Sequence, residues 1–406
     1  MAGAAARLVA STAATAAAAA AGRAALSTRA ADGAVRQLPT VLLFPGQGCQ
    51  RVGMGADLVA AYPAAARVFE EVDDALGRRL SATVFHGSQA ELTLTRNAQP
   101  ALLAFCVAAY AAGAAATPDL WSRVGVVMGH SVGEYAAAVV TGALPLRAAA
   151  RILAARADAM QVAADAAASR GHGPLGMQAL LLRAPPRTAP SAAAAPPTHA
   201  GHGAPPASWA AFEATLSVIE ATVAAERSAR GDGAVLSVAS VNSPAQVVLA
   251  GEVDAMTAVV ATLKARGLVG RAVSLDVSAP FHTPLMAPAA AAVAAALREH
   301  GVGLAPAALP IIANASGAPV SAAADVAAAL VDGITAPVRW AQGVAAVLHA
   351  PLPPHVAAAG GHHFMELAPA PTVSSLSKAC DTEGAAGHSC ISTAQHLAAF
   401  CAGLPR

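Results

Sequence analysis

The residues with the clearest potential for chemistry form the motif Gly129-His130-Ser131-Val132-Gly133, which matches G-x-S-x-G. An apolar run precedes the motif and a helical pattern follows it, which is the strand–turn–helix context that this motif requires. Such a turn exposes the serine hydroxyl, and the N–H groups at the start of the helix point towards it. We therefore predict that Ser131 is a nucleophile. An incidental Gly/Ser turn is the plainer alternative.

A serine nucleophile needs a base within hydrogen-bond reach, which is most often a histidine. His282 follows a predicted strand and a proline-containing turn, so we expect it at the edge of the sheet and predict that it is the base. His130 is adjacent to Ser131, and we expect its side chain to point elsewhere. Asp276 is the only acid that stands out as a group to orient His282, and a backbone carbonyl could serve instead, giving a dyad.

Acyl chemistry also needs two N–H donors aimed at the oxygen of the tetrahedral intermediate. The backbone N–H of Val132, the residue after the nucleophile, is the expected first donor. Gln47 lies in the glycine-rich turn Pro45-Gly46-Gln47-Gly48 at the end of an apolar run, and it could supply the second donor. This segment could also be only a turn.

The elements that must position these residues alternate between strand and helix, which indicates an α/β domain with a largely parallel sheet. Its predicted elements are the strand 40–44, a helix over 57–76 that Pro63 breaks or kinks, a helix over 99–112 opened by Pro100, the strand 124–128 and a helix from about residue 134. A second group of elements fits a small inserted α+β domain. It has predicted strands at 177–182, 235–241 and 247–251 and predicted helices at 210–227 and 253–266. The chain then returns to the larger domain through strands at 273–277, 309–313 and 363–367.

These patterns divide the chain into a large domain of residues 39–170 and 274–398, and a small domain of residues 171–273. The small domain contains a low-complexity stretch at 183–208, whose Pro, Ala and Gly content predicts a disordered surface loop. Residues 1–38 carry four arginines, several Ser and Thr, and one acid. That composition is typical of an organellar transit peptide, although an alanine-biased disordered tail would look similar.

The overall composition excludes several classes of protein. Hydrophobic residues make up 56% of the 406 residues and charged residues 12%, but alanine inflates the first figure. A membrane span needs about 20 predominantly apolar residues, and we find no such stretch. A net charge of +1 argues against a nucleic-acid binder. The five cysteines show no CxxC spacing and the histidines have no ligand-spaced partners, so we expect neither a disulfide framework nor a metal site.

Five motifs in one order complete the pattern: FPGQG at 44–48, GHSVGEY at 129–135, ARADAMQ at 155–161, VNSPAQVVLAG at 241–251 and FHTPLM at 281–286. Together they resemble the malonyl-CoA:acyl carrier protein transacylases of type II fatty acid synthesis. The resemblance implies an α/β-hydrolase-like domain with a ferredoxin-like insertion. It also implies transfer of a malonyl group from malonyl-CoA to the phosphopantetheine thiol of acyl carrier protein, without a cofactor. We expect a monomer.

The resemblance assigns a role to each matching residue. Ser131 would carry the malonyl ester, His282 would be the general base and acid, and Gln47 and Val132 would supply the oxyanion N–H groups. Arg156 would pair with the free carboxylate of the malonyl group, because a planar guanidinium can bind a carboxylate through two hydrogen bonds. A buried arginine also disfavours an acyl chain without a carboxylate.

Further residues are candidates to contact the substrate. Phe281 resembles the bulky residue of malonyl-selective relatives and would leave little room for an α-methyl branch. His130 and Asn242 are site-bordering candidates.

Three segments depart from the family pattern. Cys49 replaces a common Ser and could put a thiol near the site. The segment 337–340 resembles the one whose carbonyl orients the histidine, with Arg339 at the variable position. The turn 367–371 has alanine where the family commonly has glycine, which would cost energy if φ is positive.

Three other functions compete with this prediction. A serine thioesterase or hydrolase of related fold would need a well-placed acid, and Arg156 argues against it. A non-catalytic scaffold that binds carrier protein is disfavoured by the intact set of site residues. An excised polyketide acyltransferase domain is disfavoured by the chain length and by the predicted transit peptide. The motif pattern resembles mitochondrial members of the family and the arginine spacing of that peptide agrees, so we expect a mitochondrial location, with the chloroplast as the alternative.

Overall fold

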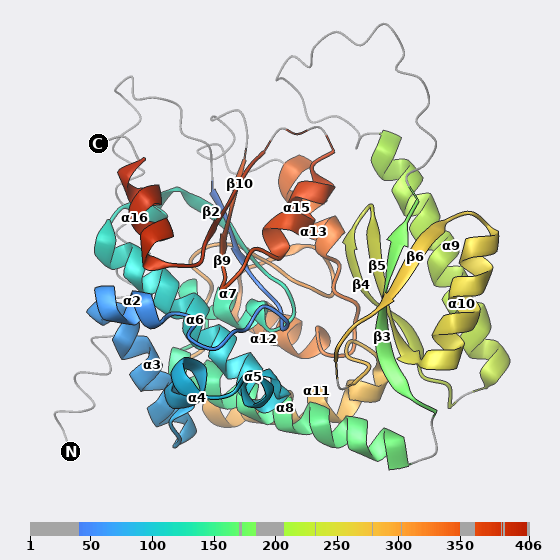
Figure 1. Ribbon diagram of the computed structural model, residues 1–406, viewed down its shortest axis with the longest axis horizontal. Coiled ribbons are helices and arrows are strands. Elements are labelled where there is room, and N and C mark those ends of the chain that lie inside the picture. Colours follow the sequence, from blue (N-terminus) through green and yellow to red (C-terminus); the bar gives the residue numbers. More distant parts are fainter. Residues whose placement is uncertain are drawn as a thin grey trace, which may run out of the picture.

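The computed structural model describes most of the chain, namely residues 40–169, 173–183, 207–231, 233–277, 279–301, 303–349, 362–382, 384 and 386–403. The predicted transit peptide and almost all of the predicted loop at 183–208 lie outside these ranges and stay predictions. Two sheets dominate the described part, and each has its own helices (Figure 1).

The larger sheet has six strands in the order β10-β9-β1-β2-β7-β8. Its strands are β1 (Thr40–Phe44), β2 (Val124–Gly129), β7 (Ile311–Ile312), β8 (Pro319–Val320), β9 (His363–Leu367) and β10 (Gly387–Ile391). Neighbouring strands are parallel except β7 and β8. β1 and β2 are fully buried apolar runs, as expected for a sheet covered on both faces.

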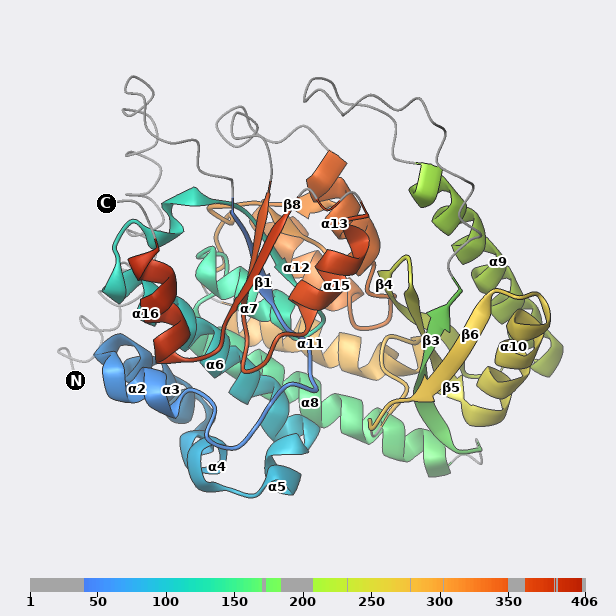
Figure 2. The same ribbon diagram turned by 45° about the horizontal axis from the view of Figure 1, so that its top comes forward.

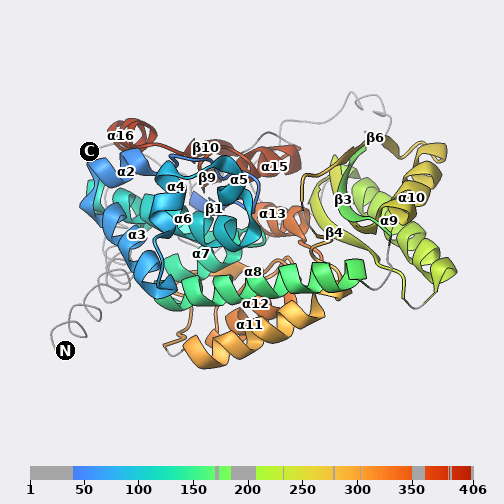
Figure 3. The same ribbon diagram turned by 60° about the horizontal axis from the view of Figure 1, so that its bottom comes forward.

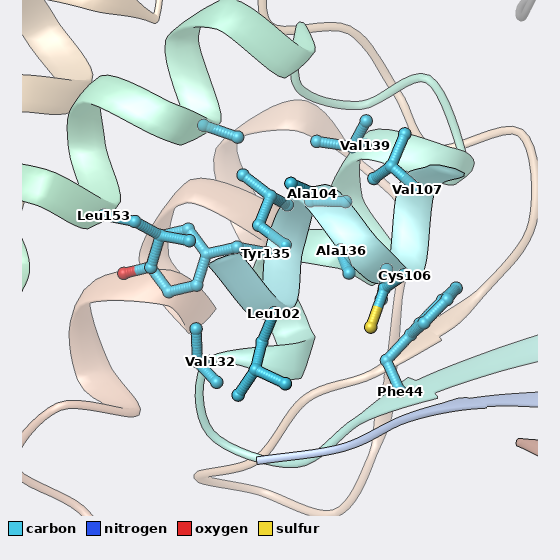
Figure 4. Packing of buried hydrophobic residues seen from close by; sticks show 14 of the residues in the cluster. Phe44, Leu102, Ala104, Cys106, Val107, Val132, Tyr135, Ala136, Val139 and Leu153 are labelled. Atoms are coloured by element: carbon cyan, nitrogen blue, oxygen red, sulfur yellow. The ribbon is translucent and has the colours of Figure 1, made fainter. Parts of the chain in front are cut away.

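Helices cover both faces of this sheet. On one face, α6 (Thr95–Ala116) and α7 (Gly133–Val140) pack on Phe44 and Val127. Figure 4 shows this packing, in which Phe44 lies beside Cys106 and the residues of α7 lie against those of α6. On the other face, α13 (Trp340–His349) and α15 (Val373–Cys380) lie between the two sheets (Figure 2).

Two long helices run side by side along the base of the molecule. They are α8 (Leu146–Ser169) and α11 (Ala287–His300), and α8 extends from the larger sheet towards the smaller one (Figure 3). The other elements are α2 (Ala56–Ala61), α3 (Pro63–Leu76), α4 (Leu80–His86), α5 (Gln89–Thr93), α12 (Ala323–Asp332), α16 (Ala394–Ala402) and the short 3₁₀ helices η1 (Leu120–Arg123) and η2 (Pro284–Met286). The predicted break at Pro63 is confirmed, because α3 begins at that residue.

The smaller sheet has four antiparallel strands in the order β4-β5-β3-β6. They are β3 (Leu175–Leu182), β4 (Leu236–Ser243), β5 (Gln246–Glu252) and β6 (Val269–Ser274), with α9 (Ala207–Arg230) and α10 (Val253–Ala265) packed on one face. The chain order β-α-β-β-α-β and this strand order are those of a ferredoxin-like unit. The predicted fold class, a mostly parallel α/β sheet plus a smaller α+β unit, is confirmed.

The opposite face of the smaller sheet turns towards the larger unit. It carries a small apolar cluster with which Phe281 and Val277 pack: Met177, Ala179, Ala239, Val248 and Ala250. A main-chain bridge also joins the two units, because the N–H of Val241 donates to the carbonyl of Val338 at 2.8 Å.

Helix α6 differs from the sequence expectation in its start and in its apolar character. The helix begins at Thr95 rather than Gln99, so Pro100 lies inside it. The missing N–H of Pro100 leaves the carbonyl of Arg96 free, and Arg78 Nη2 donates to that carbonyl at 3.0 Å. By length and composition, α6 is also apolar enough to cross a membrane, contrary to expectation, but 83% of the qualifying window is buried inside the protein.

The strand predicted at 273–277 is also misplaced. β6 ends at Ser274, and it pairs with β3 in the smaller sheet, with Ser274 opposite Gln178. The chain therefore does not return to the larger sheet before His282. That residue lies on the connection that follows β6 and precedes η2.

Candidate active site

Ser131 lies on a sharp turn between β2 and α7. Its φ is 51°, in the left-handed region that costs a non-glycine residue about 1–3 kcal/mol. The glycines on either side are required by contact: a Cβ at Gly129 would lie 2.1 Å from the carbonyl carbon of Gly133. A Cβ at Gly133 would in turn lie 2.5 Å from the carbonyl oxygen of Phe44. The predicted strand–turn–helix context of the motif is present.

His282 lies within hydrogen-bond reach of the serine. Its Nε2 lies 2.9 Å from Ser131 Oγ, and its Nδ1 lies 2.8 Å from the carbonyl oxygen of Gly333. Since a carbonyl only accepts, Nδ1 carries the proton and Nε2 is free to accept the serine proton. His282 also has a positive φ of 59°, so both members of the pair have strained backbones.

A carbonyl, rather than an acid, therefore orients the histidine. Asp276 is exposed, and in the described part of the chain no hydrogen bond or ion pair joins it to His282, so the acid alternative is wrong. The accepting carbonyl belongs to Gly333, four residues before the segment 337–340 that the family resemblance indicated. The segment instead lies against the smaller sheet, with which Val338 pairs through its main chain.

Burial keeps the histidine neutral. Desolvation, the positive charge of Arg156 and the neighbouring His130 together lower the pKa of His282 to about 3. A neutral imidazole is the form that can take a proton.

Arg156 points into the site from α8. Its side chain is buried, its Nη2 lies 3.2 Å from Ser131 Oγ, and its guanidinium lies 5.8 Å from the centre of the Tyr135 ring. Within the described residues its Nε has no hydrogen-bond partner and no carboxylate lies within ion-pair distance. Burial lowers the pKa of Arg156, with Tyr135 and Glu134 acting in the opposite sense. Burying a guanidinium without a carboxylate partner costs free energy, so an anionic group of a ligand would stabilise Arg156.

The turn after β1 lies directly against the nucleophile turn. The N–H of His130 donates to the carbonyl of Phe44 at 3.0 Å, and a Cβ at Gly46 would lie 3.0 Å from Nδ1 of His130. In the described part of the chain, the backbone N–H groups of Gln47 and Val132 donate to no protein acceptor. These two groups are therefore available to an oxyanion.

The two site-bordering candidates contact each other. His130 Nε2 lies 3.1 Å from Asn242 Oδ1, and Asn242 Nδ2 donates to Gln246 Oε1 at 2.7 Å. Ser240 also donates to Asn242 Oδ1, and the Trp340 ring lies 5.6 Å from that of His130. His130 thus points away from Ser131, as expected, and links the nucleophile turn to β4. Their predicted contacts with substrate stay predictions.

Phe281 and Cys49 occupy different surroundings. Phe281 is partly buried and packs against both the main core and the apolar face of the smaller sheet, directly before His282. The thiol of Cys49 lies in the core and donates to the carbonyl of Gly46 at 3.7 Å. Burial raises the pKa of Cys49 to about 12, so this thiol stays protonated. Alanine causes no backbone strain in the turn 367–371. Among the described residues, Ser131 and His282 are the non-glycine residues with positive φ.

Two residues at this site escaped the sequence analysis. Asn314 follows β7 and accepts a hydrogen bond from the Ser131 N–H, and Glu134 at the start of α7 accepts one from the Asn314 N–H. Asn314 comes directly after the apolar run 309–313, and a polar residue in that position was the available signal. Among the described residues, no group of three His, Cys, Asp or Glu side chains could hold a metal ion.

Comparisons with known proteins identify the family. Residues 41–207 match the acyl transferase domain family. The chain is 32% identical over 292 residues to the malonyl CoA-acyl carrier protein transacylase of Bacillus subtilis, covering 71% of this chain and 77% of the relative. It superposes on the acyl-carrier-protein S-malonyltransferase of Bartonella henselae with a TM-score of 0.69 and 30% identity, covering 90% of this chain and 99% of that one. It also superposes on a malonyl-transacylase solved in complex with a type II PKS acyl-carrier protein, with a TM-score of 0.68 and 27% identity, covering 89% and 98% of the two chains. A serine on a strand–turn–helix turn, a carbonyl-oriented histidine and an unpaired buried arginine thus occur in a chain that belongs to the malonyl CoA-acyl carrier protein transacylase family of acyltransferases.

Proposed function

We propose that this protein transfers the malonyl group of malonyl-CoA to the phosphopantetheine thiol of acyl carrier protein through a malonyl ester on Ser131. The observation that carries the proposal is the contact between the nucleophile hydroxyl and the buried guanidinium of Arg156, 3.2 Å apart. An acyl group with a terminal carboxylate would give that guanidinium its missing partner and bring its thioester carbon to the serine.

The first half-reaction follows from the positions of the two nitrogens of His282. Nε2 takes the hydroxyl proton as Ser131 Oγ attacks the thioester carbonyl, and the N–H groups of Gln47 and Val132 donate to the oxyanion. The intermediate collapses by breaking the carbon–sulfur bond, and His282 returns the proton to the coenzyme A sulfur. The second half-reaction reverses these steps with the carrier-protein thiol as nucleophile.

Arg156 also affects the pKa of His282. Its positive charge is one of the causes that lower the pKa of His282. A malonyl carboxylate bound to Arg156 would cancel part of that charge and raise the pKa of the histidine. His282 therefore becomes a stronger base when the acid-bearing acyl group is in place.

A serine hydrolase is the competing function, and the site favours it less. A hydrolase of this fold ordinarily orients its histidine with an acid, whereas His282 is held by the carbonyl of Gly333. A hydrolase of neutral esters would also leave the charge of Arg156 unpaired in the acyl complex.

The test is mass spectrometry of the purified protein after incubation with malonyl-CoA. We expect a mass increase of one malonyl group located on Ser131, followed by its transfer to added phosphopantetheinylated acyl carrier protein. Release of malonic acid without loading of the carrier protein would support the hydrolase instead.

We further propose a mitochondrial location, with the chloroplast as the alternative, and a monomer that works without a cofactor. The Arg-rich, acid-poor composition of residues 1–38 supports the organellar address. The proposed chemistry uses only side chains and backbone groups of one chain, which supports a monomer and catalysis without a cofactor. Import into isolated mitochondria and plastids tests the first, and light scattering and metal analysis of active protein test the others.

A further inference from the structure

One buried residue, Asn314, forms hydrogen bonds with the end of β2, with Ser131 and with Arg339. Its Oδ1 accepts from the N–H of Ser131 at 2.8 Å, and its Nδ2 donates to the carbonyl of Gly129 at 2.7 Å. The amide thus spans the nucleophile turn from the end of β2 to the serine. Its own carbonyl accepts from the N–H of Arg339 at 2.8 Å. All its polar groups are bonded within a buried environment.

Glu134 completes this arrangement from the first turn of α7. Its Oε1 accepts from the N–H of Asn314 at 2.9 Å. Its Oε2 lies against Gly333, where an added Cβ would be 3.1 Å from that oxygen. Gly333 supplies the carbonyl that orients His282. The same two residues therefore touch both the turn that carries the nucleophile and the loop that aims the base.

We propose that Asn314 and Glu134 are positioning residues, which hold the Ser131 backbone and the Gly333 carbonyl in the one relative placement that aligns hydroxyl and imidazole. This inference rests on the proposed acyl transfer through Ser131. It also explains how the strained φ of Ser131 persists, since the hydrogen bond to its N–H is made in that conformation. With the N–H of Ser131 bonded to Asn314, the neighbouring N–H of Val132 is the one left for the oxyanion.

The chemistry of the amide makes the role specific. Position 314 needs an acceptor for the N–H of Ser131 and a donor for the carbonyl of Gly129, and the asparagine amide supplies both. A carboxylate at this position would still accept from Ser131 but would face the carbonyl of Gly129 without a proton. At Glu134 the carbonyl oxygen of glutamine could still accept from Asn314. Burial raises the pKa of Glu134 to about 8, so a neutral group is already close to its state at neutral pH.

The first test compares Asn314→Asp with Asn97→Asp. Asn97 is a matched control, because it is also buried and its Nδ2 donates to a backbone carbonyl, that of Glu91, outside the nucleophile turn. The readout is the rate of Ser131 malonylation by malonyl-CoA in single turnovers, with melting temperatures recorded alongside. A misplaced nucleophile predicts a loss of roughly 100-fold for Asn314→Asp. The KM for malonyl-CoA should stay within about threefold, because Arg156 is untouched.

A parent-like malonylation rate in Asn314→Asp would overturn the inference, as would an equal loss in Asn97→Asp or a change confined to KM. The second test, which decides the matter if Asn314→Asp does not fold, compares Glu134→Gln with Glu134→Ala. We expect the glutamine variant to keep a rate within about fivefold of the parent and the alanine variant to lose about 30-fold or more. Equal rates in these two variants would refute the role of the hydrogen-bond acceptor. Parent protein that is never malonylated would refute the proposed function itself.

Discussion

The two sheets differ in what they contribute to the site. Three neighbouring parallel strands end at the site: β1 leads to the turn of Gln47, β2 to Ser131 and β7 to Asn314. The antiparallel strands of the smaller sheet contribute Ser240 and Asn242 of β4 and an apolar face. The candidate reacting groups therefore come from the parallel unit. The smaller unit contributes the apolar face of its sheet, which we call the wall, and hydrogen bonds from β4.

The difference follows from strand direction. Parallel strands bring all their carboxyl ends to one edge, where the N-termini of the following helices also lie, so polar groups gather there. Antiparallel strands end alternately at opposite edges, and their contribution to a site comes from a face. An alternating strand such as β3 then presents Met177 and Ala179 to one side. Substitutions in the parallel unit should therefore abolish chemistry, and those on the wall should change selectivity.

The largest expected effect is that of Ser131→Ala, which removes the nucleophile. Malonyl transfer should fall by at least about 10⁴-fold, and no covalent malonyl adduct should form. The matched control is Ser240→Ala, which removes a buried serine hydroxyl from the smaller sheet. It should change the transfer rate by less than about fivefold, since Ser240 contacts Asn242 rather than the reacting atoms. Equal losses in the two variants would break the comparison.

Arg156→Ala should have the next largest effect, because it removes the buried guanidinium beside the nucleophile. Loss of a buried charge pair is worth about 2–5 kcal/mol, so kcat/KM for malonyl-CoA should fall by about 30-fold or more. Acetyl-CoA carries no carboxylate, and its relative rate should rise. Arg151→Ala is the control: it lies on the same helix, donates to the carbonyl of Ala75 and should keep the parent preference. An unchanged malonyl preference in Arg156→Ala would contradict the assigned role.

A smaller effect is expected from Phe281→Ala, because this ring packs against the apolar face of the smaller sheet. Removing the ring opens space beside His282, so the ratio of kcat/KM for methylmalonyl-CoA to that for malonyl-CoA should rise by about tenfold. Phe69→Ala, in the core away from this wall, controls for general loss of packing. A ratio that stays at the parent value would mean that the apolar face does not set selectivity.

The smallest effect concerns acid pH. Because the pKa of His282 is lowered to about 3, the imidazole stays neutral and kcat/KM should remain nearly flat from about pH 7 to 5. Stability should behave differently. The unfolded chain binds a proton near pH 6.5 and the folded one does not, so the free energy of unfolding should fall as the pH drops from about 6.5 towards 3. Acid titration of both quantities checks this, and an activity loss centred near pH 6.5 would contradict it.

Much of the fold could be predicted from local pattern. The strands at 40–44 and 124–128 were located because buried parallel strands are short unbroken apolar runs between turn residues. The start of α6 differs from the expectation because a proline is typical of the first helical turn, whereas here Arg78, 18 residues away from Arg96, donates to the Arg96 carbonyl that Pro100 leaves without an N–H partner. The strand before His282 was assigned to the wrong sheet. Residues 269–274 pair with β3 of the smaller sheet, and an apolar run does not reveal which sheet it joins.

By itself the sequence pointed to Ser131 as the candidate nucleophile and to the family, and through the family resemblance to His282 as the candidate base and Arg156 as the candidate carboxylate-binding group, because these depend on residue types in a fixed local order. The tertiary structure decided which groups support them. The carbonyl of Gly333 orients His282, Asn314 and Glu134 hold the turn, and His130 bonds to Asn242 rather than to Ser131. These contacts join residues 51 to 183 positions apart, and any residue has a carbonyl to offer. Such partners are selected by packing and distance, which no local pattern encodes.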